Sequence, residues 1–110
     1  MFGFLKRVLA PSGTGPDFEK AASILVEVIS HLSTSRAEFA YSSFPDRSQA
    51  IATFSDLEKR VREHDTSALF EVRNYFAPTG DLQEIAISSG WSRRYLKLAS
   101  KFDIATGAGA

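Results

Sequence analysis

The chain contains no cysteine among its 110 residues. Disulfide bonds, thiolate metal sites and cysteine nucleophiles are therefore excluded, and we expect a cytoplasmic protein. Histidine is scarce as well, because only His31 and His64 are present. The sequence has no HExxH motif and no GxSxG elbow, and it shows no nucleophile beside a base. We therefore expect a protein that is not an enzyme and that uses neither a metal nor a cofactor.

Charge of one sign is not in excess, since 13 basic and 13 acidic residues give a net charge of zero. A nucleic-acid binder usually carries a basic excess, because phosphate contacts supply much of its affinity. DNA binding would thus require the positive charge to be concentrated on one face.

Long hydrophobic runs are also missing. The apolar segment Met1–Ala10 is interrupted by Lys6 and Arg7, and it is too short to span a bilayer. It does not have the layout of a secretory signal either. We expect no integral membrane segment. Residues 1–10 are interpreted as a short amphipathic segment that packs on the core or contacts a membrane or a partner.

The length and composition indicate one domain. The chain is 44% hydrophobic and 24% charged, which is ordinary for a globular protein. The PSGTGP sequence at residues 11–16 predicts a linker. We expect a single helical domain over residues 17–103 and a flexible tail over residues 104–110, which are rich in small side chains.

Apolar residues recur at helical spacing through most of the chain, and no convincing pair of strands is present. The sequence predicts an all-α fold, an irregular bundle of five or six short helices with tight, capped loops. The expected helices cover about residues 17–32, 36–42, 46–64, 65–76, 81–89 and 92–102.

Start and stop signals flank these segments. Asp17, Asp65 or Thr66, and Ser92 are placed as helix caps, and Gly90 as the left-handed residue after the fifth helix. Capping boxes are expected at the pairs Ser35/Glu38, Asp46/Gln49 and Asp81/Glu84.

The segment 47–65 has a charged face on which opposite charges alternate. Three pairs of opposite charge stand four residues apart, namely Asp56/Arg60, Glu58/Arg62 and Lys59/Glu63. Four basic and four acidic residues cancel over this segment. The pattern predicts a solvated helix face and no nucleic-acid footprint.

The residues Ile85-Ala86, Gly90-Trp91-Ser92 and Tyr95-Leu96 form a recognisable pattern. With it, residues 82–99 resemble a helix-turn-helix unit, and more narrowly the first such unit of AraC-type regulators. The resemblance implies that Leu96 and Ala99 are buried. It also implies that Arg93, Arg94 and Lys97 face the major groove, with Lys101 near the DNA backbone.

An ordinary amphipathic helix explains the same segment. Tyr95, Leu98, Ala99 and Phe102 form an apolar stripe, which is rotated by roughly 60° from the face that the motif would bury. Trp91 would then pack back onto Ile85 or Ala86. The four basic residues would form the solvated face of the helix.

A third interpretation makes this region a binding surface for an acidic protein partner, since tryptophan and arginine dominate interface energies. We favour a protein partner over DNA, and a non-catalytic role like that of immunity proteins, antitoxins or adaptors. DNA binding through residues 82–102 is the alternative. We expect Arg94→Glu with Lys97→Glu to change stability by no more than about 0.5 kcal/mol. The candidate partner-binding residues are Trp91, Arg93, Arg94, Lys97, Lys101, Pro78 and Thr79.

Overall fold

The computed structural model describes residues 15–34, 44–78 and 80–107. Five α-helices and no strand occupy these ranges, so the predicted all-α class is confirmed. The helices are α2 (Phe18–Thr34), α3 (Arg47–Arg62), α4 (Thr66–Tyr75), α5 (Asp81–Ser89) and α6 (Ser92–Thr106).

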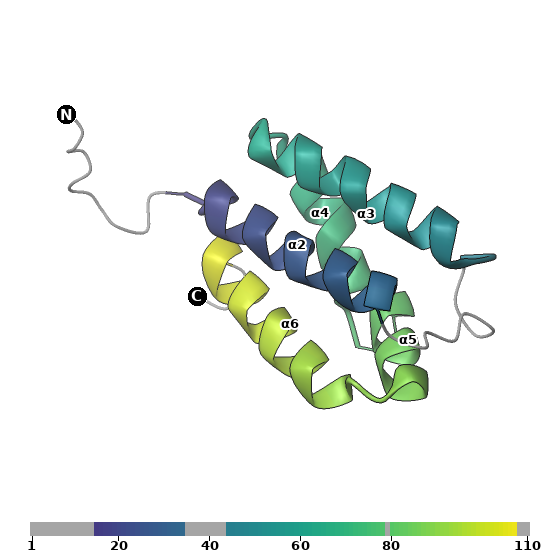
Figure 1. Cartoon of the computed structure of the whole chain (residues 1–110). Coiled ribbons are helices and arrows are strands. Elements are labelled where there is room, and N and C mark those ends of the chain that lie inside the picture. The colour runs from purple at the N-terminus through teal and green to yellow at the C-terminus, as the bar shows by residue number, and fades with distance from the viewer. Residues whose placement is uncertain (1–14, 35–43, 79, 108–110) are drawn as a thin grey trace.

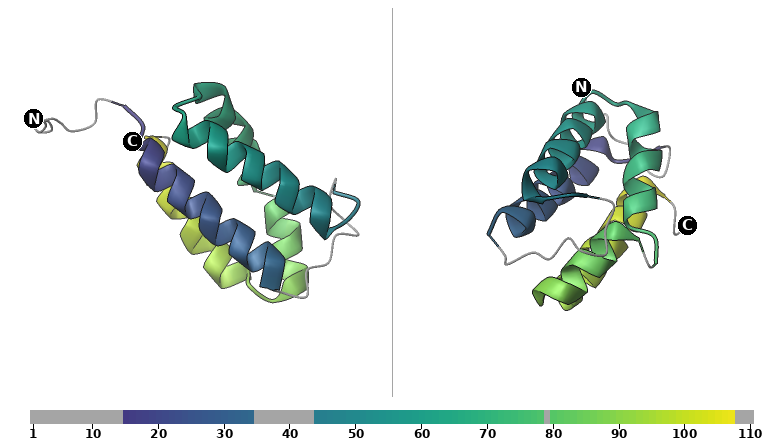
Figure 2. Two further views of the ribbon diagram at one scale, coloured as in Figure 1. Left: turned by 45° about the horizontal axis from the view of Figure 1, so that its top comes forward. Right: turned by 90° about the vertical axis from the view of Figure 1, so that its right-hand side faces the viewer.

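Helix α2 is the central element of the bundle. It lies between α3 and α6 and contacts both (Figure 1). Helix α4 follows α3 and packs on the side of the bundle away from α2, as the turned view in Figure 2 shows. Helix α5 precedes α6 and contacts it. This arrangement leaves one long side of α6 facing outward.

The core is formed by the apolar stripes that the sequence predicts. Leu25, Val28 and Leu32 of α2 are fully buried, because the central helix is covered by two neighbours. Leu98 and Phe102 of α6 are also fully buried, which places the predicted apolar stripe of this helix against the bundle. No polar or charged residue is buried within the described ranges. The core is therefore purely apolar there.

The helix starts divide into those capped by a side chain and those that are not. Asp17 accepts from the Lys20 amide at 3.0 Å, and Asp46 accepts from the Gln49 amide at 2.9 Å. Asp65 caps α4 by accepting from the amides of the second and third residues of that helix. These predicted caps are confirmed.

Two predicted caps were wrong. Gly80 is the N-cap of α5 and Trp91 is the N-cap of α6, and neither makes a side-chain cap hydrogen bond. Asp81 and Ser92 are instead the first helical residues. A Cβ atom at Gly80 would lie 2.9 Å from the Ala77 carbonyl oxygen, so this turn brings backbone against backbone. The N-cap of α5 is therefore a glycine at position 80, one residue before the aspartate that the sequence pattern suggested as the cap.

The last helix is longer than predicted, so the expectation of a tail from Ile104 was wrong for residues 104–106. Ala105 is 8% exposed, and its carbonyl oxygen accepts from the Asp17 amide at 2.7 Å. This contact joins the start of α2 to the end of α6 (Figure 1). The predicted segment 1–10, the helix over 36–42 and residues 108–110 lie outside the described part of the chain.

Candidate protein-binding face

Gly90 and Trp91 form the junction between α5 and α6. Gly90 has φ 85°, in the left-handed region that favours glycine. Its amide donates to the Ile87 carbonyl, and the Trp91 amide donates to the Ala86 carbonyl at 2.9 Å. This pair of bonds is the Schellman arrangement, so the predicted role of Gly90 is confirmed. The junction fixes the direction in which α6 leaves α5.

The Trp91 side chain joins α6 to α2. Its indole stacks on the His31 ring with centroids 4.7 Å apart and planes 9° from parallel. The residue is 8% exposed, and its buried Nε1 has no hydrogen-bond partner among the described residues. The ring therefore packs on α2, and the ring stacking with His31 is a contact that the sequence did not predict. Little of Trp91 remains for a partner to contact.

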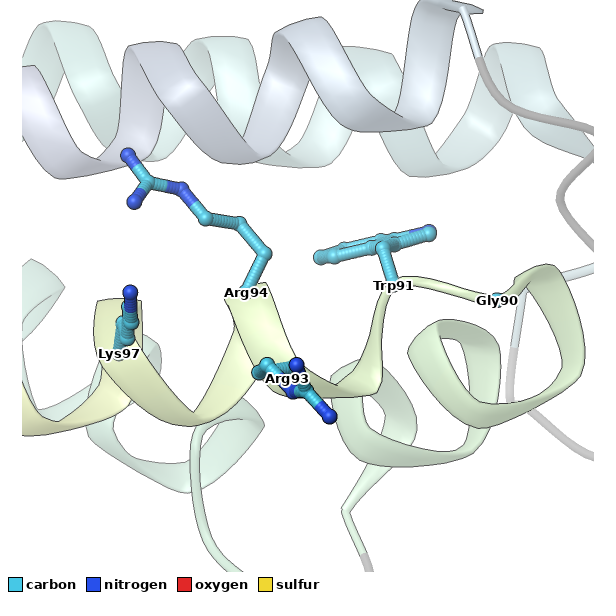
Figure 3. A pocket seen from close by; sticks show the side chains of 5 residues that line it. All are labelled: Gly90, Trp91, Arg93, Arg94 and Lys97. Carbon is cyan, nitrogen blue, oxygen red and sulfur yellow. The ribbon is translucent and has the colours of Figure 1, made fainter.

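Arg94 also reaches from α6 to α2. Its Nε donates to a Glu27 carboxylate oxygen at 3.1 Å, and its Nη2 contacts the same oxygen. Figure 3 shows Arg94 and Trp91 pointing toward the neighbouring helix. Because Arg94 is paired, we no longer expect Arg94→Glu with Lys97→Glu to change stability by only about 0.5 kcal/mol. The Arg94→Glu substitution would place two carboxylates together.

Arg93, Lys97 and Lys101 lie on the exposed side of α6. They stand four residues apart, so they follow one another along the same side of the helix. We call these three residues the basic stripe. Within the described part of the chain, none of them takes part in an ion pair.

A shallow hollow of about 320 Å³ lies at the start of the basic stripe (Figure 3). It brings together four of the predicted partner-binding residues, with Gly90 on its border. Arg93 and Lys97 contribute charges that have no ion pair among residues 15–34, 44–78 and 80–107, and Arg94 contributes a guanidinium that is held by Glu27. The lining residues are Gly90, Trp91, Arg93, Arg94 and Lys97.

The other predicted site residues are not part of this hollow. Pro78 lines a second hollow of about 270 Å³, which we call the apolar hollow. Thr79 lies outside the described residues. The two hollows share no lining residue, so Pro78 does not line the same hollow as the basic residues. The apolar hollow is lined by Phe76, Pro78, Gln83, Tyr95, Leu96, Ala99 and Asp103.

Two arginines near the end of α3, Arg60 and Arg62, differ from the basic stripe because they are paired. Arg60 bonds to Asp65 at 3.0 Å and to Glu71 at 2.8 Å, and it lies 3.5 Å from Asp56. Arg62 pairs with Glu58 in the same helix. Two of the predicted pairs four residues apart, Asp56/Arg60 and Glu58/Arg62, are therefore present. The predicted pair Lys59/Glu63 was wrong, because no ion pair joins these two residues in the described part of the chain. Arg60 in addition ties α3 to α4.

These contacts shift the ionisation of Asp65. Hydrogen bonds from Ser67 first, and then from Arg60, lower the Asp65 pKa from 3.8 to about 2. The same kind of bonding, from Glu71 and then Asp65, raises the pKa of Arg60. Both effects stabilise the charged forms, so the ion pairs persist over the ordinary pH range.

Both histidines make ring contacts with aromatic side chains, although His64 is exposed. His31 stacks on Trp91, and His64 stacks on Phe18 with centroids 4.3 Å apart. His64 lies just beyond α3 in the left-handed region, with φ 64°. Among the described residues, no three His, Cys, Asp or Glu side chains gather in a way that could hold a metal ion.

Sequence reasoning missed Glu27 as the partner of Arg94, and it missed the exposed Leu96. Glu27 lies 67 positions before Arg94, and nothing local links the two residues. Leu96 could have been found, because it falls outside the apolar stripe of α6 and is 62% exposed.

The fold and this face define a small helical bundle whose last described helix carries a basic stripe, and no ion pair to this stripe is formed within the described ranges. Comparison with protein-family models, with curated proteins and with solved structures found no match. None of the helices in the described ranges has the length and apolar character needed to cross a membrane.

Proposed function

We propose that this chain is a small, non-catalytic protein-binding module and that the basic stripe receives an acidic partner. The observation that carries the proposal is the stripe itself. Like charges four residues apart on a helix repel each other and lower its stability. Arg93, Lys97 and Lys101 nevertheless follow one another, and none of them takes part in an ion pair in the described structure. An acidic partner would remove that repulsion.

The position of the stripe strengthens this assignment. Arg93 lies in the first turn of α6, where the partial positive charge of the helix N-terminus disfavours a cation. The first turn contains no acidic residue to compensate. The presence of these three basic residues is therefore explained neither by the stability of α6 nor by ion pairs within the described fold. Recognition of an acidic partner would explain it.

The module would act in the cytoplasm, in the manner of an immunity protein, antitoxin or adaptor. The absence of cysteine supports that compartment. The type of role rests on the chain's size and on the face available for binding, because no motif specifies it.

DNA binding through residues 82–102 is the alternative proposal, supported by the same stripe and by the glycine at the α5–α6 junction. The burial pattern of α6 favours a protein partner instead. Leu96, which a helix-turn-helix would bury, is 62% exposed, whereas Leu98 is fully buried. The exposed side of α6 therefore offers an apolar side chain beside its charges, which suits a protein surface better than phosphates.

Fluorescence anisotropy with two labelled probes of equal net charge tests the proposal at about 50 mM salt, where phosphate contacts are strong. One probe is a 12-residue peptide of glutamate and alanine with one leucine, and the other is a random DNA duplex. We expect the peptide to bind more tightly and Lys97→Glu to abolish its binding. The matched control is Lys59→Glu, at an exposed lysine of α3, which should bind like the parent protein. Tighter binding of the duplex would favour the DNA alternative, and binding of neither probe would contradict both.

A further inference from the structure

The apolar hollow has a rigid floor made by two aromatic rings. Phe76 and Tyr95 lie with ring centroids 5.9 Å apart and planes 25° from parallel. The Tyr95 hydroxyl donates to the Phe76 carbonyl oxygen at 2.8 Å, and this bond is buried. The bond ties α6 to the end of α4, so the floor is held in place before anything binds.

The apolar hollow and the basic stripe adjoin along α6, and Leu96 lies between them. Leu96 follows Arg93 by three residues and precedes Ala99 by three. On a helix with 3.6 residues per turn, each step of three residues moves about 60° around the axis in the same sense. Leu96 therefore has the basic stripe on one side and the apolar hollow on the other.

The size of the apolar hollow limits what it can bind. Its volume of about 270 Å³ lies at the lower limit of pockets that hold cofactors or metabolites. Its lining is mostly apolar, and the two polar side chains are Gln83 and Asp103. A single large apolar side chain fits this description.

We infer that the apolar hollow receives one large apolar side chain of the acidic partner, while carboxylates of the same segment reach the basic stripe. This inference rests on the proposed function and adds the partner's recognition element, an acidic segment that carries an apolar anchor. Charge complementarity to Arg93, Lys97 and Lys101 makes the segment acidic. The shared boundary at Leu96 places the anchor directly beside those charges.

Asp103 gives the segment a direction. It lines the apolar hollow from the last part of α6, on the side away from Arg93. A carboxylate of the partner would be repelled there and attracted on the side of the basic stripe. We therefore expect the acidic residues to lie on one flank of the anchor only.

Three labelled 12-residue peptides test this inference by anisotropy with the full chain. The first has one leucine with glutamates on one flank, the second has alanine in place of that leucine, and the third has glutamates on both flanks. We expect the second to bind at least about tenfold more weakly than the first, as expected when a buried leucine is lost. On the parent protein, we expect the third peptide to bind no more tightly than the first. On the Asp103→Asn variant, we expect the third peptide to bind more tightly than the first.

Leu96→Ser removes part of the wall of the apolar hollow. It should therefore weaken binding of the first peptide about as much as replacing the peptide's leucine by alanine does. The matched control is Phe70→Ser on α4, because Phe70 is 61% exposed and Leu96 is 62% exposed. The control should bind like the parent. Far-ultraviolet circular dichroism confirms that both variants are folded.

The results separate this inference from the proposed function. Equal binding of the leucine and alanine peptides, still lost with Lys97→Glu, would overturn the anchor and leave the acidic partner in place. Binding of no acidic peptide would contradict both. Binding to phosphatidylserine vesicles alone would also contradict both, since it would make the face a lipid-binding surface.

Discussion

Helices α3 and α6 both carry several basic residues, but they use them in opposite ways. Arg60 and Arg62 of α3 are each paired with carboxylates. They also lie in the last turn of their helix, where cations are favoured by the helix dipole. On α6, Arg93 lies in the first turn, where the dipole opposes it, and Lys97 follows with no ion pair in the described structure.

The comparison separates basic residues whose ion pairs stabilise the fold from basic residues that form no such pairs in the described structure. Arg60 holds α3 to α4, Arg62 pairs with Glu58 of α3 and Glu19 of α2, and both complement the end of their own helix. Within α6, only Arg94 has a comparable role, through Glu27 of α2. The remaining cations of α6 are the part of the surface that the fold does not explain.

The largest expected effect concerns which side of α6 faces the core. Leu98→Ala should lower the free energy of unfolding by about 3 kcal/mol, because it opens a cavity at a fully buried position. Leu96→Ala should change it by less than about 0.5 kcal/mol, because Leu96 is exposed. Urea unfolding followed by circular dichroism measures both. A larger loss for Leu96→Ala would mean that α6 is rotated and that the basic stripe is not where we place it.

The pairing of Arg94 with Glu27 should have a smaller effect on stability. Arg94→Glu should cost about 1 kcal/mol, because it replaces an attraction with repulsion in a partly exposed pair. The double variant Glu27→Lys, Arg94→Glu should recover most of the loss, since the pair is restored with its charges exchanged. If the double variant does not recover the lost free energy of unfolding, Arg94 stabilises the fold through packing and not through its charge.

The ion pairs at the end of α3 should make the stability of the protein depend on pH through Asp65. The Asp65 pKa is lowered from 3.8 to about 2 in the folded protein, first by Ser67 and then by Arg60. Its stabilising contribution is therefore present above about 4 and is lost as the pH falls toward 2. Thermal midpoints measured across this window should fall less steeply in Asp65→Asn than in the parent. Equal slopes would mean that the Asp65 contacts do not stabilise the α3–α4 connection.

Most of the helices could be predicted because their signals are local. The caps at Asp17, Asp46 and Asp65 and the left-handed Gly90 follow from residue type and spacing. The start of α5 could not be predicted from such signals. Gly80 takes the cap position because carbonyl oxygens of residues 74, 75 and 77 crowd its backbone, and the path of that turn is not specified by cap residues and their spacing.

The site could be predicted only in part. The basic stripe follows from the helical spacing of Arg93, Lys97 and Lys101. The roles of Arg94 and Trp91 depend on α2, whose residues are distant in sequence. That Pro78 lines a different hollow from the basic residues likewise depends on how α5 turns the chain before α6 begins.

The central claim is that the basic stripe does not stabilise the fold. Urea unfolding of Lys97→Glu tests this claim most directly. Arg62→Glu is the corresponding variant in α3. Lys97→Glu places a carboxylate four residues from both Arg93 and Lys101, so the free energy of unfolding should stay the same or rise by up to about 0.5 kcal/mol. Arg62→Glu should be less stable than the parent, because its contacts with Glu58 and Glu19 become repulsive. A loss of more than about 1 kcal/mol in Lys97→Glu would contradict the claim.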